Sequence, residues 1–263
     1  MSPLLRTSLS MQRRTVIGWG IGLAGVVVVY AAFYPSIRAS ATDLGAYLDK
    51  LPDAVKNVIG NDYTTPAGYL RAEVFSLLGP ILLLVYAIGA GGRAIAGEEE
   101  ARSLDLLLST PLSRAAVLRD KALALLLTLL ALSALVFVVI VVLGPVFGLS
   151  VPIGDLAAAC VMFLLLGVVF GALALAVGAA TGRRAWATGV AGGVAVASYV
   201  LNAVAPSVRG LAWARPLSPF RWYFEPDPLT AGLRATNVLV LSAIAAAGIA
   251  AAFWSFDRRD LAA

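Results

Sequence analysis

Histidine is absent from this 263-residue sequence, and cysteine occurs once, as Cys160. Without histidine the chain lacks Ser-His nucleophile pairs, the His-Glu-x-x-His metalloprotease motif and most zinc sites. A single cysteine forms neither an intrachain disulfide nor a metal cluster. Because Cys160 lies inside an apolar run, we interpret it as a small buried hydrophobe. The sequence therefore predicts no catalytic residue and no metal ligand in this chain.

Charged residues are also scarce. They make up 13% of the chain, whereas a soluble domain contains about 25%. Hydrophobic residues make up 60%, and the mean hydropathy is +0.89. The net charge is +5, but the basic residues flank apolar segments and do not gather in one patch. This distribution is typical of membrane proteins and argues against nucleic-acid binding.

Six apolar segments are long enough to cross a bilayer, which takes about 20 residues. We predict spans at about 15–34, 72–92, 122–143, 156–181, 185–205 and 237–256. No span has an ionisable residue in its interior, and Glu73 lies at an edge. The first span, followed by Ala39-Ser40-Ala41, resembles a secretory signal, but it exceeds the usual apolar length of about 7–15 residues. We therefore predict one all-α integral membrane domain over residues 1–263.

An even number of spans places both termini on one side of the membrane. If that side is the cytosol, the inner segments hold twelve of the 20 Lys and Arg residues and the outer segments hold eight. The positive-inside rule favours this orientation. The expected location is the bacterial plasma membrane, with a multi-pass topology and cytosolic termini.

The two longest outer loops have distinct patterns. Between about 43 and 60, apolar residues recur at helical spacing, which predicts two short amphipathic helices on the outer membrane surface. These helices would either shield the ends of the spans or gate a translocation path. The last outer loop, 206–236, is rich in aromatic residues between prolines, and we interpret it as an interfacial anchor. Those aromatic residues are Trp213, Phe220, Trp222, Tyr223 and Phe224.

Glycines also recur four residues apart within the spans. Such pairs let helix backbones approach closely. They serve either packing within the fold or a seam between two copies. The pairs are Gly18/Gly22, Gly167/Gly171, Gly178/Gly182 and Gly189/Gly193.

The segment from Gly97 to Arg114 is the one long charged run between two strongly apolar segments. Glu98, Glu99 and Glu100 would occupy the first turn of a helix, where the macrodipole stabilises acids, with Gly97 as its N-cap. Glu98 and Arg102 would form an i,i+4 pair.

The same segment contains an apolar face made by Leu104, Leu107 and Leu108. Pro111 would end the first helix, and Thr110 would then cap a second helix that continues into the third span. A solvated connector is one interpretation. The run of leucines favours the other, in which the segment fills a groove on a partner.

Short motifs occur in a fixed order in and around this segment. They are Glu99-Glu100, Ser103, Asp105-Leu106-Leu107, Leu108-Ser109-x-Pro111-x-Ser113-Arg114 and Lys121, together with Leu51-Pro52, Thr65-Pro66-x-Gly68-Tyr69 and Leu217-Ser218-Pro219-Phe220. With six spans, this order resembles the membrane subunit (permease) of type-2 ABC transporters, chiefly exporters. The similarity covers nearly the whole chain. It departs from the usual pattern at Arg102 (glycine), Ser103 (threonine) and Asp120 (glycine).

The resemblance implies that two permeases, identical or related, pair in the membrane and that each docks on a cytosolic ATP-binding cassette subunit. ATP and Mg²⁺ would bind that subunit, because this chain has no Gly-x-x-x-x-Gly-Lys-Ser/Thr loop. The coupling loop would span 93–121, with docking on 97–121. The resemblance assigns coupling to Glu98, Glu99, Glu100, Arg102, Leu104, Asp105, Leu107, Leu108, Pro111, Ser113, Arg114 and Lys121.

Charge-free spans favour hydrophobic or amphipathic cargo over small ions. Other functional classes explain the sequence less well. An intramembrane enzyme or a secondary transporter would place ionisable groups near the membrane centre. A scaffold or assembly protein would not need the ordered motifs. An importer permease would carry a glutamate-alanine-alanine loop signature, which this sequence lacks.

Overall fold

The computed structural model describes residues 2–40, 62–101, 113–208 and 210–259. Within them it contains helices and no strand, and six helical runs are long and apolar enough to span a membrane. The second run comprises several short elements in series. The runs are α1 (Pro3–Ala39); α4 (Pro66–Leu70), η1 (Arg71–Leu78), α5 (Gly79–Gly92), η2 (Arg93–Gly97) and α6 (Glu98–Glu100); α8 (Arg114–Phe147); α9 (Ile153–Thr181); α10 (Arg184–Val204); and α13 (Ala235–Arg258).

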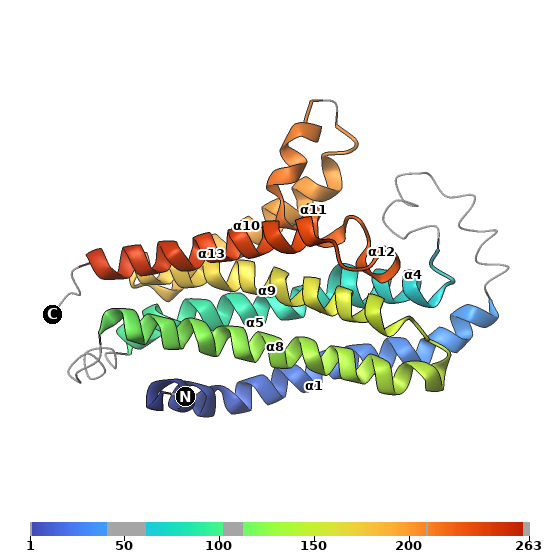
Figure 1. Ribbon diagram of the computed structural model, residues 1–263, viewed down its shortest axis with the longest axis horizontal. Helices are drawn as coiled ribbons and strands as arrows, with labels where there is room; N and C mark the ends of the chain where they lie inside the picture. Colours follow the sequence, from blue (N-terminus) through green and yellow to red (C-terminus); the bar gives the residue numbers. More distant parts are fainter. Residues whose placement is uncertain (1, 41–61, 102–112, 209, 260–263) are drawn as a thin grey trace.

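This architecture confirms the predicted all-α membrane fold. The first three runs extend well beyond the predicted apolar segments, because charged and polar turns continue the helices at their ends. Both termini lie at the same end of the bundle (Figure 1). The two amphipathic helices predicted between about 43 and 60 lie outside the described residues.

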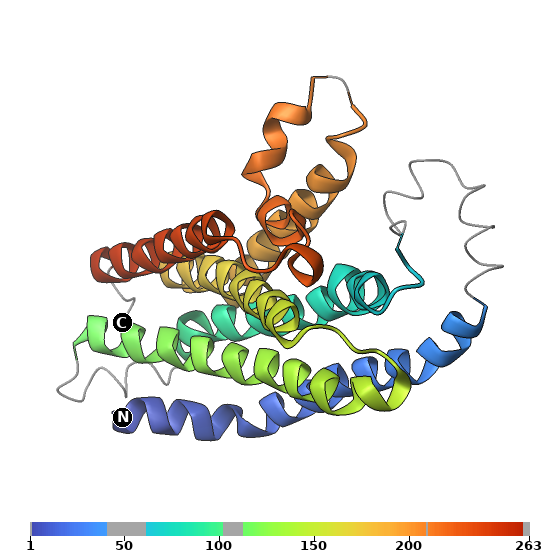
Figure 2. The same ribbon diagram turned by 45° about the vertical axis from the view of Figure 1, so that its right-hand side comes forward.

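Helix α9 occupies the centre of the bundle, with α5, α8, α10 and α13 packed around it and α1 beside α8 (Figures 1 and 2). Small residues permit this crowding. A Cβ atom on Gly167 would lie 2.9 Å from the Leu83 side chain of α5, and one on Gly171 would lie 3.1 Å from Leu125 of α8. The Gly167/Gly171 pair therefore packs the fold internally. In contrast, a Cβ on Gly189 or Gly193 would meet no described atom within 4 Å.

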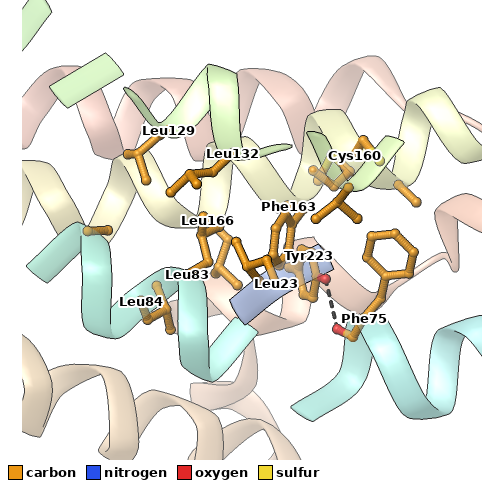
Figure 3. Packing of buried hydrophobic residues seen from close by; sticks show 14 of the residues in the cluster. Leu23, Phe75, Leu83, Leu84, Leu129, Leu132, Cys160, Phe163, Leu166 and Tyr223 are labelled. Atoms are coloured by element: carbon orange, nitrogen blue, oxygen red, sulfur yellow. Dashed lines mark hydrogen bonds between the residues drawn. The ribbon is translucent and has the colours of Figure 1, made fainter. Parts of the chain in front are cut away.

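The second run contains two π-helical segments, η1 and η2. At the end of η1 the Gly79 N–H bonds to the Val74 carbonyl, five residues back. The next bond in this register would come from residue 80, but Pro80 has no N–H. The Phe75 carbonyl instead accepts a hydrogen bond of 2.8 Å from the hydroxyl of Tyr223 (Figure 3). A distant loop thus satisfies a backbone group inside an apolar core.

The loop 206–236, predicted as an interfacial anchor, is partly buried in the bundle. It forms η3 (Ala212–Leu217), α11 (Pro219–Phe224) and α12 (Pro228–Ala231). Phe220 and Tyr223 are each only 2% exposed and belong to the main core, while Trp213 is 74% exposed. The anchor prediction was therefore wrong for Phe220 and Tyr223. Their sequence context resembles that of Trp213, but α11 turns them onto α9 and η1.

Candidate functional site

The three consecutive glutamates end the second helical run, contrary to our prediction that they begin a new helix. Gly97 is helical (φ −69°, ψ −32°) and belongs to η2, so it is not an N-cap. The helix dipole disfavours acids at a C-terminal end. Groups on other elements must therefore stabilise the three carboxylates.

Each glutamate has a positive or N–H partner on a different element. Glu98 forms an ion pair with Lys121 of α8, whose side chain is only 7% exposed. Glu99 forms an ion pair with Arg259, which follows α13. Glu100 Oε1 accepts a 2.8 Å hydrogen bond from the backbone N–H of Arg184, at the first turn of α10, where the dipole does stabilise an acid.

Two arginines, Arg114 and Arg259, bond to backbone carbonyls at the ends of α13 and α9. Arg114 Nη1 donates to the carbonyls of Phe256, at 3.3 Å, and Arg259, at 2.7 Å, which lie at the C-terminus of that helix. Arg259 Nη1 donates to the Ala179 carbonyl near the end of α9, at 3.0 Å. Cations at these positions satisfy carbonyls that a helix end leaves unbonded.

Gly182, in the turn between α9 and α10, permits this close approach. Its φ is +66°, in the left-handed region that glycine adopts readily. A Cβ atom there would lie 2.7 Å from both the Glu99 carboxylate and Arg259 Nη2. We call Glu98, Glu99, Glu100, Arg114, Lys121, Arg184 and Arg259 the charged clasp. It joins the end of the second run to α8, α9, α10 and α13.

Helix α8 begins three residues later than we predicted. Ser113 is extended (φ −70°, ψ 148°) and its Oγ accepts from the Ala116 N–H at 3.2 Å, which makes Ser113 the N-cap. A helix from Thr110 through Arg114 is therefore wrong. The Ser113 hydroxyl accepts a hydrogen bond from an otherwise unpaired N–H in the first turn and so favours a helix start at this residue, which sequence periodicity did not reveal.

Asp120, where the family pattern has glycine, is 4% exposed and has a structural role. Its carboxylate accepts from the hydroxyl of Ser2, the N-cap of α1, and forms a 3.3 Å ion pair with Arg119. The start of α8 is therefore linked to the start of α1 as well as to the clasp.

The structure brings together five of the twelve predicted coupling residues, namely Glu98, Glu99, Glu100, Arg114 and Lys121, with Ser113 at the edge. Arg102, Leu104, Asp105, Leu107, Leu108 and Pro111 lie outside the described residues, so their contact face stays a prediction. Sequence reasoning missed Arg184, Arg259 and Gly182. Their position just beyond predicted span ends was the available signal. No group of three acidic or cysteine side chains in the described ranges could hold a metal ion.

The comparison with protein families decides what kind of membrane protein this is. The profile described as ABC-2 family transporter protein matches residues 3–261. The chain belongs to the ABC-2 family. It is thus the membrane component, or permease, of an ABC transporter, and not its ATPase. A search of curated proteins gave no match for this permease.

Proposed function

We propose that this permease is the membrane half of an ATP-driven exporter for hydrophobic or amphipathic cargo. A separate ATP-binding cassette subunit, which binds ATP and Mg²⁺, docks on residues 97–121. The clasp end of the bundle faces the cytosol of a bacterium, and both termini lie on that side. The excess of Lys and Arg at this end supports the orientation.

The charged clasp is the observation that carries this proposal. Glu100 and Arg114 flank the segment 101–113 in the sequence, and both of these residues contact other helices. A force applied to the segment by a docked ATPase therefore reaches α8 through Lys121, α10 through Arg184 and α13 through Arg259. The clasp connects one docking point to most of the spanning helices.

A second copy of this permease, or a related one, completes the transporter in this proposal. The apolar face of α10 around Gly189 and Gly193 has space for a neighbouring backbone. Val196 and Val200 on the same helix are 66% and 50% exposed. Lipid alone would not need glycines at these positions, whereas a close helix–helix contact would.

The docking test uses the permease co-expressed with the ATP-binding cassette protein encoded beside it. Leu107→Asp places a charge on the predicted contact face, and we expect loss of ATPase co-purification and of permease-stimulated ATP hydrolysis. Leu233→Asp is the matched control, because Leu233 is 50% exposed and lies just before the start of α13, whereas the clasp residue Arg259 follows the end of that helix. Retained co-purification and stimulation in Leu107→Asp would show that the ATPase docks elsewhere.

A further inference from the structure

A narrow apolar groove runs along the bundle between α8 and α13, with α9 as its floor. Its volume is about 210 Å³. Arg119 is the one polar residue among those that line it. The lining residues are Arg119, Ala122, Leu123, Leu125, Leu126, Val168, Ala172, Leu175, Ile249 and Phe253.

The groove exists because α13 packs closely on α9 through small residues, while the α8 side chains that line the groove leave a gap between α8 and α13. A Cβ atom on Gly248 of α13 would lie 3.2 Å from Ala172 of α9, so these two backbones are close. On the α8 side, Leu123 and Leu126 are each 39% exposed and form the opposite wall. No described segment of the chain fills the space between them.

The groove has a positive end. The Arg119 side chain is 62% exposed, although its guanidinium also contacts Asp120. Phe253 connects the groove to a second recess of about 330 Å³, which Arg114 and Asp257 line. Arg258 stacks on Trp254, 4.6 Å from the ring, and that indole is 61% exposed. Exposed arginines beside a tryptophan at the end of a span are typical of the lipid headgroup level.

We propose that this groove binds one anionic phospholipid, with an acyl chain between α8 and α13 and its phosphate on Arg119. An apolar cavity of about 150 Å³ holds one benzene molecule, so this groove is suited to a segment of a single acyl chain. It is too narrow for a helix, whose diameter with side chains is about 10 Å. Arg114, Arg119 and Arg258 outnumber the neighbouring acids Asp120 and Asp257, which favours an anionic headgroup over a zwitterionic one.

This inference does not rest on ATPase docking or on cargo. The bound lipid would fasten α8 to α13 across the gap, at the end where the clasp also joins them. Fastening the two helices in this way needs both the apolar groove and its positive end. A free phosphate compound would occupy only the positive end, and an uncharged lipid only the groove.

The test measures phosphatidylglycerol retained by the purified full-length permease, using native mass spectrometry after reconstitution in mixed phosphatidylglycerol and phosphatidylcholine nanodiscs. We expect one phosphatidylglycerol to remain bound per chain in the wild type. Arg119→Gln should weaken its retention about tenfold, the ratio expected for one lost charge-assisted hydrogen bond. Arg119→Lys should recover part of the binding. Leu126→Trp, which fills the groove from α8, should also displace the lipid.

Matched variants control for general effects. Arg183→Gln removes an exposed charge at the same end, and Leu127→Trp adds an indole at a residue that is also 39% exposed but does not line the groove. Both should retain phosphatidylglycerol. Equal retention of phosphatidylcholine, equal stabilisation of the protein by glycerol phosphate, or unchanged lipid binding in both Arg119→Gln and Leu126→Trp would overturn the proposal. Recovery of a partner protein in place of the lipid would overturn it as well.

Discussion

Lys121, in the third turn of α8, forms an ion pair with Glu98 at the end of the second helical run, and the Lys121 side chain is almost completely buried. These residues stand on opposite sides of the segment 101–113. The pair therefore joins the two ends of the proposed docking region, residues 97–121. Buried charges are costly unless they are paired, so replacing either side chain should destabilise the fold.

The Glu98–Lys121 pair leads to a charge-reversal prediction. Lys121→Glu should lower the free energy of unfolding of the purified permease by about 1–3 kcal/mol, because two carboxylates would then face each other. The reversed pair, Glu98→Lys with Lys121→Glu, should recover much of this loss. Arg183→Glu serves as the control for charge reversal at the same end. A double variant no more stable than the Lys121→Glu single variant would contradict the pairing.

A second prediction concerns the π-helical segment η1. Tyr223→Phe removes the hydroxyl that bonds to the Phe75 carbonyl and leaves that carbonyl without its donor. The expected loss is about 1–3 kcal/mol in the free energy of unfolding, measured as a lower melting temperature in detergent. Tyr199→Phe is the control, because it retains the ring contact with Phe220 at 5.2 Å. Similar melting temperatures for the two variants would contradict the stabilising role of the Tyr223 hydroxyl.

A third prediction tests pairing through α10. Gly193→Leu adds a side chain on a face that is open within one chain, so the monomer should fold and insert normally. Pairing with a second copy should weaken, because the backbones could no longer approach closely. Cross-linking and mass measurement in nanodiscs report the oligomeric state. Gly154→Leu, at another position with open space around the Cβ, should leave pairing intact; if it impairs pairing equally, the seam is not on α10.

The fourth prediction concerns the pH dependence of stability at Asp227, the N-cap of α12. Burial raises the pKa of Asp227 above its ordinary value, and the Leu229 N–H and Arg71 offset this only in part. The folded protein therefore binds this proton more tightly than the unfolded chain. The contribution to stability is present below the ordinary pKa and is lost as pH rises through the raised pKa.

Asp227→Asn should remove this pH dependence while keeping an oxygen that caps α12. The melting temperature of the variant relative to wild type should therefore increase from acidic to neutral pH. The measurement is a series of thermal melts in one detergent at fixed salt concentration. A difference that stays constant or decreases over this range would show that Asp227 does not titrate as described.

The sequence predicted the features that depend on local composition. Long apolar runs must form helices in a bilayer because no other open structure satisfies the backbone there, so the six spans could be placed before the structure. The local sequence pattern gave the wrong prediction for Glu98, Glu99 and Glu100. A glycine before three acids indicates a helix start on local grounds, but Lys121, Arg259 and the Arg184 N–H stabilise the acids at a helix end instead.

The sequence by itself determined that this protein lies in a membrane, has six spans and carries the ordered motifs of an ABC-2 permease. Hydropathy and motif order require no knowledge of which helices touch. Only the tertiary structure decided that Glu98 meets Lys121, that Tyr223 supplies a bond to Phe75, and that α8 and α13 leave a groove headed by Arg119. These contacts join residues distant in sequence, and the packing of side chains around α9 brings them together.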